Sequence, residues 1–152
     1  MRQLLMLAAF VIVTFAVAAF GSQFQPGDWY AALNKPTWTP PGWIFPPVWT
    51  MLYLAMAVAA WLVWRTGGWR DNRWALSFFA LQLAINGLWS WLFFGRQAIG
   101  AALIDIAVLL AVVVITAVLF WKKRQTAGWL LVPYLLWLSF ASALNFQIWR
   151  LN

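Results

Sequence analysis

Five long apolar runs dominate the chain, and polar or proline-rich stretches separate them. The runs cover approximately residues 4–24, 44–64, 74–94, 99–121 and 128–149. Each run has about the 20 residues that a helix needs to cross the hydrocarbon core of a bilayer. Because lipid cannot hydrogen-bond to an open sheet edge, the runs predict helices. The sequence therefore predicts an all-α integral membrane protein, a bundle of five transmembrane helices in the single domain 1–152.

The connections between these runs differ in length. The first, about residues 21–43, is long, whereas the others, at 65–73, 95–98 and 122–127, are short. Short connections join neighbouring antiparallel helices, which predicts an up-and-down bundle. We expect the first run to be a retained helix, because it is longer than the apolar part of a signal peptide and lacks a clear A-x-A site.

The segment from Pro36 to Tyr53 combines tryptophan with proline. It contains Trp38, Trp43, Trp49, Pro36, Pro40, Pro41, Pro46 and Pro47. Proline fixes φ and removes a backbone donor, so this segment is stiff. Tryptophan adds a large flat surface with one polar N–H, which suits both membrane interfaces and planar ligands. We interpret the long first connection as a lid over a binding site at the mouth of the bundle.

Composition excludes several classes of site. The 152 residues are 65% hydrophobic and 9% charged, which is too apolar for a small soluble domain. The absence of Cys and His excludes disulfides, Cys/His zinc sites, Cys or His nucleophiles and the usual haem ligands. No metal site and no obligatory cofactor are expected, and a bound tetrapyrrole would be a metal-free porphyrin or a weakly ligated haem. Without paired carboxylates, a phosphate-binding glycine loop or a Ser triad, binding or transport is favoured over classical catalysis.

The basic residues indicate an orientation. Ten basic and three acidic residues give a net charge of +7. The basic residues are scattered among helix ends, which favours anionic lipid or an anionic ligand over nucleic acid. On the side of the N-terminus lie Arg2, Arg65, Arg70, Arg73, Lys122, Lys123 and Arg124. The other side has Lys35, Arg96 and Arg150. This asymmetry predicts an inside N-terminus and an outside lid, facing the periplasm in a bacterial inner membrane.

Polar and aromatic residues share helix faces in three of the predicted spans. They are Trp49, Tyr53 and Met56 in the second span, Gln82, Asn86, Trp89 and Ser90 in the third, and Trp137, Ala141 and Asn145 in the fifth. Polar side chains are costly in hydrocarbon, so these faces should point into the bundle. Together with Trp38 and Pro41 of the lid they predict an aromatic pocket for a flat, largely apolar ligand.

Structural roles are the alternative for most of these residues. Many of the 14 tryptophans should pack or anchor the protein at the interface, and those near helix ends suit that role: Trp29, Trp69, Trp121 and Trp149. Asn86 and Asn145 would serve equally well as hydrogen-bonded bridges between helices, and Gln82 suits a bridge slightly better than a ligand contact.

Two further features lie inside the spans. Asp105 is the only carboxylate there, which makes it a candidate for proton or ligand chemistry, although pairing with Arg96 or hydration near the helix end is the alternative. Ala80, Ala84 and Gly87 form a small-residue face that gives weak support for a homodimer interface.

Three separated stretches carry a family resemblance. They are WYAALNKPTWTPPGWIFPPVWTMLY at 29–53, NGLWSWLFFG at 86–95 and PYLLWLSFASALNFQIWRLN at 133–152. In this order they resemble the TspO/MBR family, which comprises the tryptophan-rich sensory proteins of bacteria and the mitochondrial translocator proteins (peripheral-type benzodiazepine receptors). The resemblance covers nearly the whole chain. A bacterial source is favoured, with the mitochondrial outer membrane as the location in a eukaryote.

The resemblance implies a five-helix bundle, often homodimeric, that binds porphyrins such as protoporphyrin IX beneath the first loop. Mammalian members also bind cholesterol and isoquinoline carboxamide-type ligands. Matched by motif, the pocket residues are Tyr30, Trp49, Asn86, Trp137 and Ala141. In some bacterial relatives the tryptophans matching Trp49 and Trp137 are implicated in light-dependent porphyrin breakdown, so these two are the candidate catalytic residues.

One departure weakens the sterol expectation. The mammalian cholesterol motif has a tyrosine where this chain has Phe146, so only weak sterol contact is expected. The leading hypothesis is a membrane-embedded porphyrin-binding protein that senses, sequesters or moves its ligand. The alternatives are a light- and oxygen-dependent porphyrin-degrading enzyme and a sterol or lipid transporter or scaffold.

Overall fold

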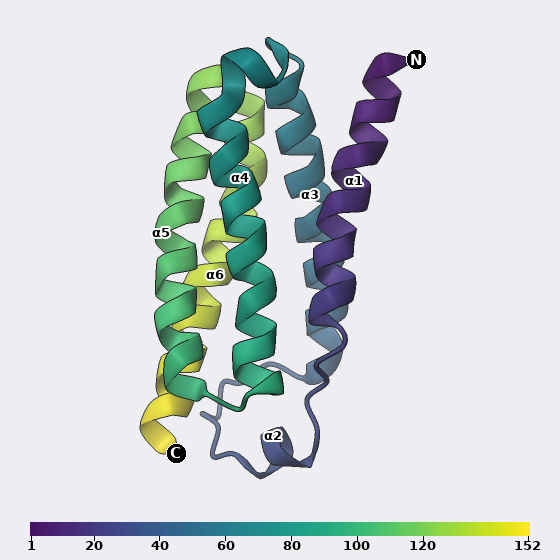
Figure 1. The fold of residues 1–152 in the computed structure, drawn as a ribbon. Coiled ribbons are helices and arrows are strands. Elements are labelled where there is room, and N and C mark those ends of the chain that lie inside the picture. Colours follow the sequence, from purple (N-terminus) through teal and green to yellow (C-terminus); the bar gives the residue numbers. More distant parts are fainter.

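The five apolar runs form five long helices in the computed structural model, which describes all residues from 1 to 152 (Figure 1). The long helices are α1 (Arg2–Gly21), α3 (Phe45–Trp64), α4 (Gly68–Ser90), α5 (Ile99–Lys123) and α6 (Gln125–Leu151). Each is long and apolar enough to cross a membrane, and no strand is present. The prediction of an all-α, five-helix integral membrane protein is thereby confirmed.

The helices alternate in direction, so the lid and the C-terminus lie at one end of the bundle and the N-terminus at the other (Figure 1). α6 packs against both α5 and α3, and α4 packs against α5. α1 stands at the edge of the bundle, where it packs on α3 and less extensively on α4. Small side chains on α3 allow close approach of the other helices, since Ala57, Ala59 and Ala60 are completely buried.

α1 is the helix least covered by protein. Thr14 is its only buried residue, and the Thr14 hydroxyl donates to carbonyls of its own helix, at Phe10 and Val11. Most of the apolar surface of α1 is therefore not covered by the rest of the protein, which sets this helix apart from the other four long helices.

The turns on the N-terminal side contain more helix than predicted. A helical turn that begins at Gly68 lies inside the connection expected at 65–73, but Asn72 has non-helical φ and ψ angles (−121° and 18°), so the regular part of α4 begins close to the expected position 74. Asn72 is buried there, and its amide donates to the carbonyl oxygens of Val63 (3.1 Å) and Gly68 (2.9 Å). The connection expected at 122–127 is wrong, since only Arg124 separates α5 from α6. Charged residues suggested loops, but the helices continue past the apolar runs.

The lid contains two short helical segments, α2 (Asp28–Ala32) and the 3-10 turn η1 (Gly42–Ile44). It begins close to the predicted position, since α1 ends at Gly21 and α3 starts at Phe45. At the same end of the bundle as the lid, α4 continues after Ser90 as the π-helical segment η2 (Trp91–Gly95). A π-helical turn widens the helix and re-aims its side chains, here directly below the lid.

Candidate functional site

One part of the lid, α2, covers the aromatic end of α4 and η2. The ring centroids of Trp29 and Phe93 are 5.8 Å apart, and that of Tyr30 lies 5.6 Å from Phe94. Phe93 also stacks on Trp89 at 4.9 Å. Burial raises the pKa of the Tyr30 phenol above its usual value. Tyr30 and Trp89 thus share one aromatic cluster, and Trp29, expected as an interface anchor, packs there too.

The proline-rich part of the lid covers α6. Trp38 packs edge-on against Phe140 at 5.7 Å, and Phe45, the first residue of α3, packs edge-on against Trp137 at the same distance. Trp137 and Phe140 lie 5.5 Å apart. Pro41, in contrast, is exposed at the start of η1. The lid therefore places Trp38, but not Pro41, in aromatic contact with the predicted α6 face.

Hydrogen bonds attach the lid to the end of α6. The backbone N–H of Asn34 donates to Oδ1 of Asn152 (3.0 Å), and Nδ2 of Asn152 donates to the Asn34 carbonyl (2.9 Å). Nearby, the Lys35 ammonium donates to the carbonyls of Tyr30 and Leu33 at the end of α2. We call the reciprocal Asn34–Asn152 pair the lid tether.

A chain of polar side chains crosses the bundle below the lid. The Tyr53 hydroxyl donates to Oδ1 of Asn86, and Nδ2 of Asn86 donates to the Tyr134 hydroxyl (2.9 Å). Tyr134 in turn donates to Oε1 of Gln82 (3.0 Å), whose amide reaches the sulfur of Met56 at 3.6 Å. These five residues, which we call the polar chain, are buried and join α3, α4 and α6.

The polar chain gives a structural role to several predicted ligand residues. Tyr53, Gln82 and Asn86 come together as expected, but they are hydrogen-bonded to protein. Sequence reasoning missed Tyr134, although it lies one turn before Trp137 and carries a hydroxyl inside a span. A second bridge joins Trp89 to Asn145 (3.0 Å), and the Asn145 amide reaches the Ile99 carbonyl (3.2 Å).

Trp49 and Trp137 lie on facing elements, α3 and α6. The Trp49 ring is tilted on Tyr53 at 5.6 Å and meets the edge of Tyr134 at 6.1 Å. Ala141 lies one turn beyond Trp137 on α6 and is half-buried against the core. The structure thus brings Trp49 next to the polar chain, and Trp137 and Ala141 below the lid.

Two buried side-chain atoms have no hydrogen-bond partner. They are the indole nitrogen of Trp137 and Oδ2 of Asp105. The Asp105 side chain is only 8% exposed and does not pair with Arg96, which instead lies 5.7 Å from the Trp91 ring. Buried polar groups in proteins are nearly always hydrogen-bonded, so these two unpaired atoms are exceptions that need an explanation.

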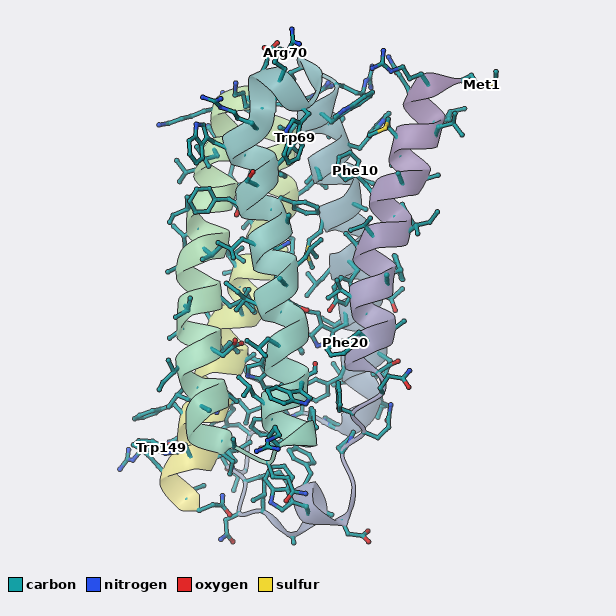
Figure 2. The ribbon with its side chains drawn as sticks, viewed as in Figure 1. Met1, Phe10, Phe20, Trp69, Arg70 and Trp149 are labelled. Atoms are coloured by element: carbon teal, nitrogen blue, oxygen red, sulfur yellow. The ribbon has the colours of Figure 1, made fainter.

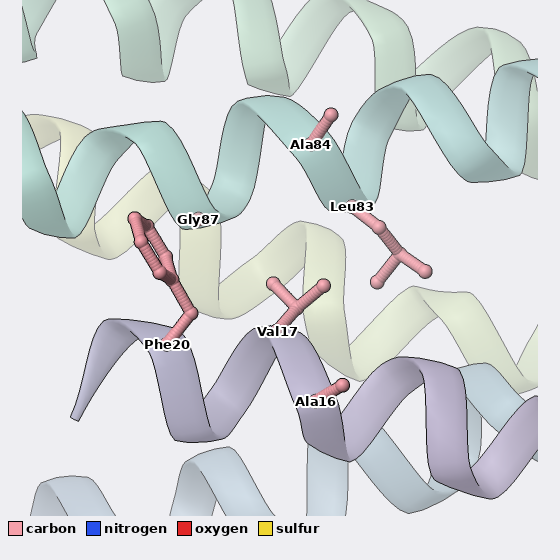
Figure 3. A pocket seen from close by; sticks show the side chains of 6 residues that line it. All are labelled: Ala16, Val17, Phe20, Leu83, Ala84 and Gly87. Atoms are coloured by element: carbon pink, nitrogen blue, oxygen red, sulfur yellow. The ribbon is translucent and has the colours of Figure 1, made fainter. Parts of the chain in front are cut away.

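The predicted small-residue face lies elsewhere, along the open side of α1. Ala80, Ala84 and Gly87 line an apolar groove between α1 and α4, which we call the α1–α4 groove (Figures 2 and 3). Gly87 is buried under α1, where an added Cβ would stand 3.3 Å from Val17. Ala80 and Ala84 are exposed in the groove. Within one chain the small-residue face of Ala80, Ala84 and Gly87 thus lies next to α1. Its role as a homodimer interface stays a prediction.

Comparison with known proteins identifies the same family as the sequence motifs around this site. The TspO/MBR family model matches residues 7–150, which include the lid, the polar chain and all but the last residue of α6. The chain belongs to the TspO/MBR family. Its family membership and its five apolar helices make it a multi-pass integral membrane protein.

Relatives in this family come from all three domains of life. The chain is 45% identical to the tryptophan-rich protein TspO of Chlorobaculum tepidum, over 99% of this chain and 98% of the relative. It is 43% identical to the tryptophan-rich protein TspO of Archaeoglobus fulgidus, over 98% of both. It is 40% identical to the human translocator protein, over 87% of this chain and 81% of the relative.

Proposed function

We propose that this TspO/MBR protein binds a porphyrin, such as protoporphyrin IX, between the lid and the bundle, and that it acts in porphyrin sensing, sequestration or transport. The observation that carries the proposal is the indole N–H of Trp137, which is buried without an acceptor among the rings of Phe45 and Phe140. An unpaired buried donor costs about 1–3 kcal/mol, which a ligand bringing an acceptor would recover.

The surroundings of Trp137 favour a flat aromatic ligand. Trp38, Phe45 and Phe140 offer ring faces and edges, and such contacts contribute about 0.5–1.5 kcal/mol each beyond burial. These rings touch one another, so a porphyrin would enter by displacing the lid from α6. The only polar demand made on the ligand is an acceptor for the indole, which an unprotonated imine-type ring nitrogen or a carboxylate supplies.

The charges at the lid end suit the two acidic side chains of a porphyrin. Lys35 stands 4.7 Å from the centre of the Tyr30 ring, and Arg96 and Arg150 lie at the same end of the bundle. With the porphyrin ring below the lid, its carboxylates would reach these cations at the water interface. No metal is required by this arrangement, which agrees with a metal-free porphyrin.

The names of relatives support the broader roles without deciding between them. One relative is named a tryptophan-rich sensory protein and others are named translocator proteins. We extend sensing and transport to this chain as part of the proposal, together with a bacterial membrane and an outward-facing lid. Weak binding of a sterol or an isoquinoline carboxamide-type ligand would use the same aromatic surfaces.

The test is a titration of the detergent-purified protein with protoporphyrin IX in the dark, followed by tryptophan quenching and porphyrin absorption. We expect saturation near one porphyrin per chain and an affinity reduced about tenfold in Trp137→Phe, which keeps the ring but removes the N–H. Trp49→Phe should also weaken binding. Trp129→Phe, at the opposite end and 61% exposed, is the matched control and should bind normally.

Other outcomes distinguish the alternatives. Linear quenching that is equal in all variants would mean that porphyrin only partitions into the micelle, and the proposal would be wrong. A sterol that competes with porphyrin would favour the lipid-transport alternative. Repeating the experiment under light and oxygen tests for breakdown, because a distinct product formed over many turnovers, and lost in Trp49→Phe and Trp137→Phe, would show an enzyme.

A further inference from the structure

Asp105 is the one carboxylate in the interior of the bundle, and the site below the lid makes no use of it. It lies on α5 about 9 Å along the helix axis from Ile99, the first residue of this helix, at 1.5 Å per residue. Its side chain is buried, and Oδ2 has no hydrogen-bond partner. An ionisable residue within a membrane span marks a functional site by default, so Asp105 needs an explanation of its own.

The elements around Asp105 offer no basic side chain at its depth in the membrane. α3, α4, η2 and α6 pack against α5. Their titratable residues inside the bundle are Tyr53 and Tyr134, and both hydroxyls are hydrogen-bonded in the polar chain. Charged residues lie at or next to the helix ends, and they are Arg65, Arg70, Asp71, Arg73, Arg96, Lys122, Lys123 and Arg150. An ionised Asp105 would therefore be an uncompensated charge in an apolar interior, which is costly.

A proton suits this position better than a metal ion. Hard cations take several oxygen ligands, whereas a proton needs one oxygen atom. No group of three or more acidic, Cys or His side chains comes together in this chain, and the other two acids, Asp28 and Asp71, lie in the lid and at the start of α4. Protonation turns Asp105 into a neutral carboxylic acid, which removes the cost of a buried charge.

Asp105 lies close to the residues that the lid covers. Ala102, one turn before Asp105 on α5, belongs to the apolar cluster of Phe93, against which Tyr30 of the lid packs. Asp105 is also near enough to Tyr134 of the polar chain for its charge to act on that phenol. Charges act over longer distances in the low dielectric of a bundle than in water, so the charge state of Asp105 should affect an anion bound below the lid.

We propose that Asp105 binds a proton in the folded bundle, and that this proton is required for tight binding of an anionic porphyrin below the lid. The inference rests on the proposed function, because the two carboxylates of a porphyrin are ionised at neutral pH. With Asp105 neutral, the basic residues at the lid end attract these carboxylates without opposition. When rising pH removes the proton, the new negative charge repels the ligand, and the affinity falls.

Dark titrations with protoporphyrin IX at two pH values test this coupling. Between about pH 6 and about pH 9 the porphyrin carboxylates stay ionised, so their own titration does not interfere. We expect the wild type to bind at least about tenfold more weakly at the higher pH. Asp105→Asn cannot ionise, so it should bind equally at both pH values and more tightly than the wild type at the higher one. A merely structural role of Asp105 would not produce this gain in affinity.

Two controls isolate the charges involved. Asp71→Asn removes an exposed carboxylate at the opposite end of the bundle and should keep the pH response of the wild type. The dimethyl ester of protoporphyrin IX has no carboxylate, so the wild type should bind it equally at both pH values.

Infrared spectroscopy of the ligand-free protein tests the proton directly. At about pH 6 the wild type should show the carbonyl stretch of a protonated carboxylic acid, because exposed carboxylates are ionised at this pH. The band should shift in D2O, disappear as the pH rises, and be absent from Asp105→Asn. The wild-type spectra alone decide this point if the variant does not fold.

Several results would overturn the proposal. They are a missing acid band in the wild type, an identical pH response in the wild type and Asp105→Asn, and an affinity that follows the sodium concentration at constant pH and ionic strength, which would show a metal cation in place of the proton. Failure of every variant to bind porphyrin at either pH would overturn the proposed function and the coupling together. Normal binding that is equal at both pH values would overturn the coupling alone.

Discussion

At the scale of single residues, hydrogen bonding separates structural groups from groups available to a ligand. Asn86 and Gln82 are satisfied within the polar chain, whereas the Trp137 indole and one oxygen of Asp105 are not. In hydrocarbon no water can satisfy such atoms, so each is either a cost to stability or a contact kept for a ligand. The two classes of residue should respond differently to substitution.

Replacing Asn86 should destabilise the bundle. Asn86→Leu leaves the Tyr53 hydroxyl without its acceptor and removes a donor from Tyr134. We expect a loss of about 1–2 kcal/mol in the free energy of unfolding, measured by denaturant titration in detergent. Gln23→Leu is the control, because Gln23 is exposed and its side chain bonds only to the end of α1. An Asn86→Leu protein as stable as the wild type would show that the polar chain contributes nothing.

The sequence was sufficient to place these residues but not to pair them. Helical periodicity correctly placed Tyr53, Gln82 and Asn86 at buried positions, since polar groups in a span avoid lipid. Periodicity does not show which polar groups meet, because that depends on the relative rotation and depth of α3, α4 and α6. For the same reason it did not reveal that Tyr134 completes the polar chain, or that Ala80 and Ala84 lie beside α1.

At the scale of elements, two pieces are attached more weakly than the rest: the lid and α1. The lid rests on aromatic contacts and on the lid tether at the membrane surface, where water competes for its hydrogen bonds. α1 has a single buried residue. Elements with few buried contacts open at low free-energy cost, so these two are the ones that can move.

Weakening the lid tether should speed porphyrin exchange. In Asn152→Ala the two hydrogen bonds between the Asn34 backbone and the Asn152 side chain are lost. We expect association and dissociation rates to rise together, severalfold, with a smaller change in affinity, as measured by stopped-flow tryptophan quenching. Ser139→Ala, an exposed change elsewhere on α6, is the control. Unchanged rates would mean that lid opening does not limit exchange.

Gly87 should determine how closely α1 approaches α4. An added Cβ at Gly87 would lie 3.3 Å from Val17 and 3.5 Å from Phe20, so Gly87→Leu must push α1 away. We expect a loss of about 1–3 kcal/mol in the free energy of unfolding. Gly42→Leu in the lid is the matched control, because nothing lies within 4 Å of the Cβ added at this position. Equal stability of the two variants would contradict the close packing of α1 on α4.

The extents of the helices were less predictable than their number. Apolar runs mark the hydrocarbon core, so they indicated five spans correctly. They do not mark where a helix ends in the interface, because polar residues remain helical there. α5 and α6 illustrate this, since α5 continues to Lys123 and α6 already begins at Gln125, inside the connection expected at 122–127.

At the scale of the whole molecule, charge and topology together predict one orientation. Seven basic residues lie at the end with the N-terminus and three at the end with the lid. Positive charge is retained on the cytoplasmic side during insertion, so the lid should face outwards. Porphyrin would then enter from the outer side of the membrane.

Because the chain has no cysteine, single introduced cysteines can test this orientation. Gln25→Cys lies in the exposed lid, and Gln125→Cys lies at the exposed start of α6 on the opposite side. A membrane-impermeant maleimide added to intact cells should label the Gln25→Cys variant readily and the Gln125→Cys variant only after permeabilisation. The reverse pattern would contradict the charge-based orientation.

The lid tether also affects any tag or label that is attached to the C-terminal end of α6. Residues that follow Asn152, whether native or added as an affinity tag, must leave the bundle directly beside Asn34. A tag fused there without a spacer would compete for this space and alter ligand exchange in an otherwise unmodified protein. The same proximity is useful, since an environment-sensitive fluorophore attached by a short linker would report on lid movement in real time.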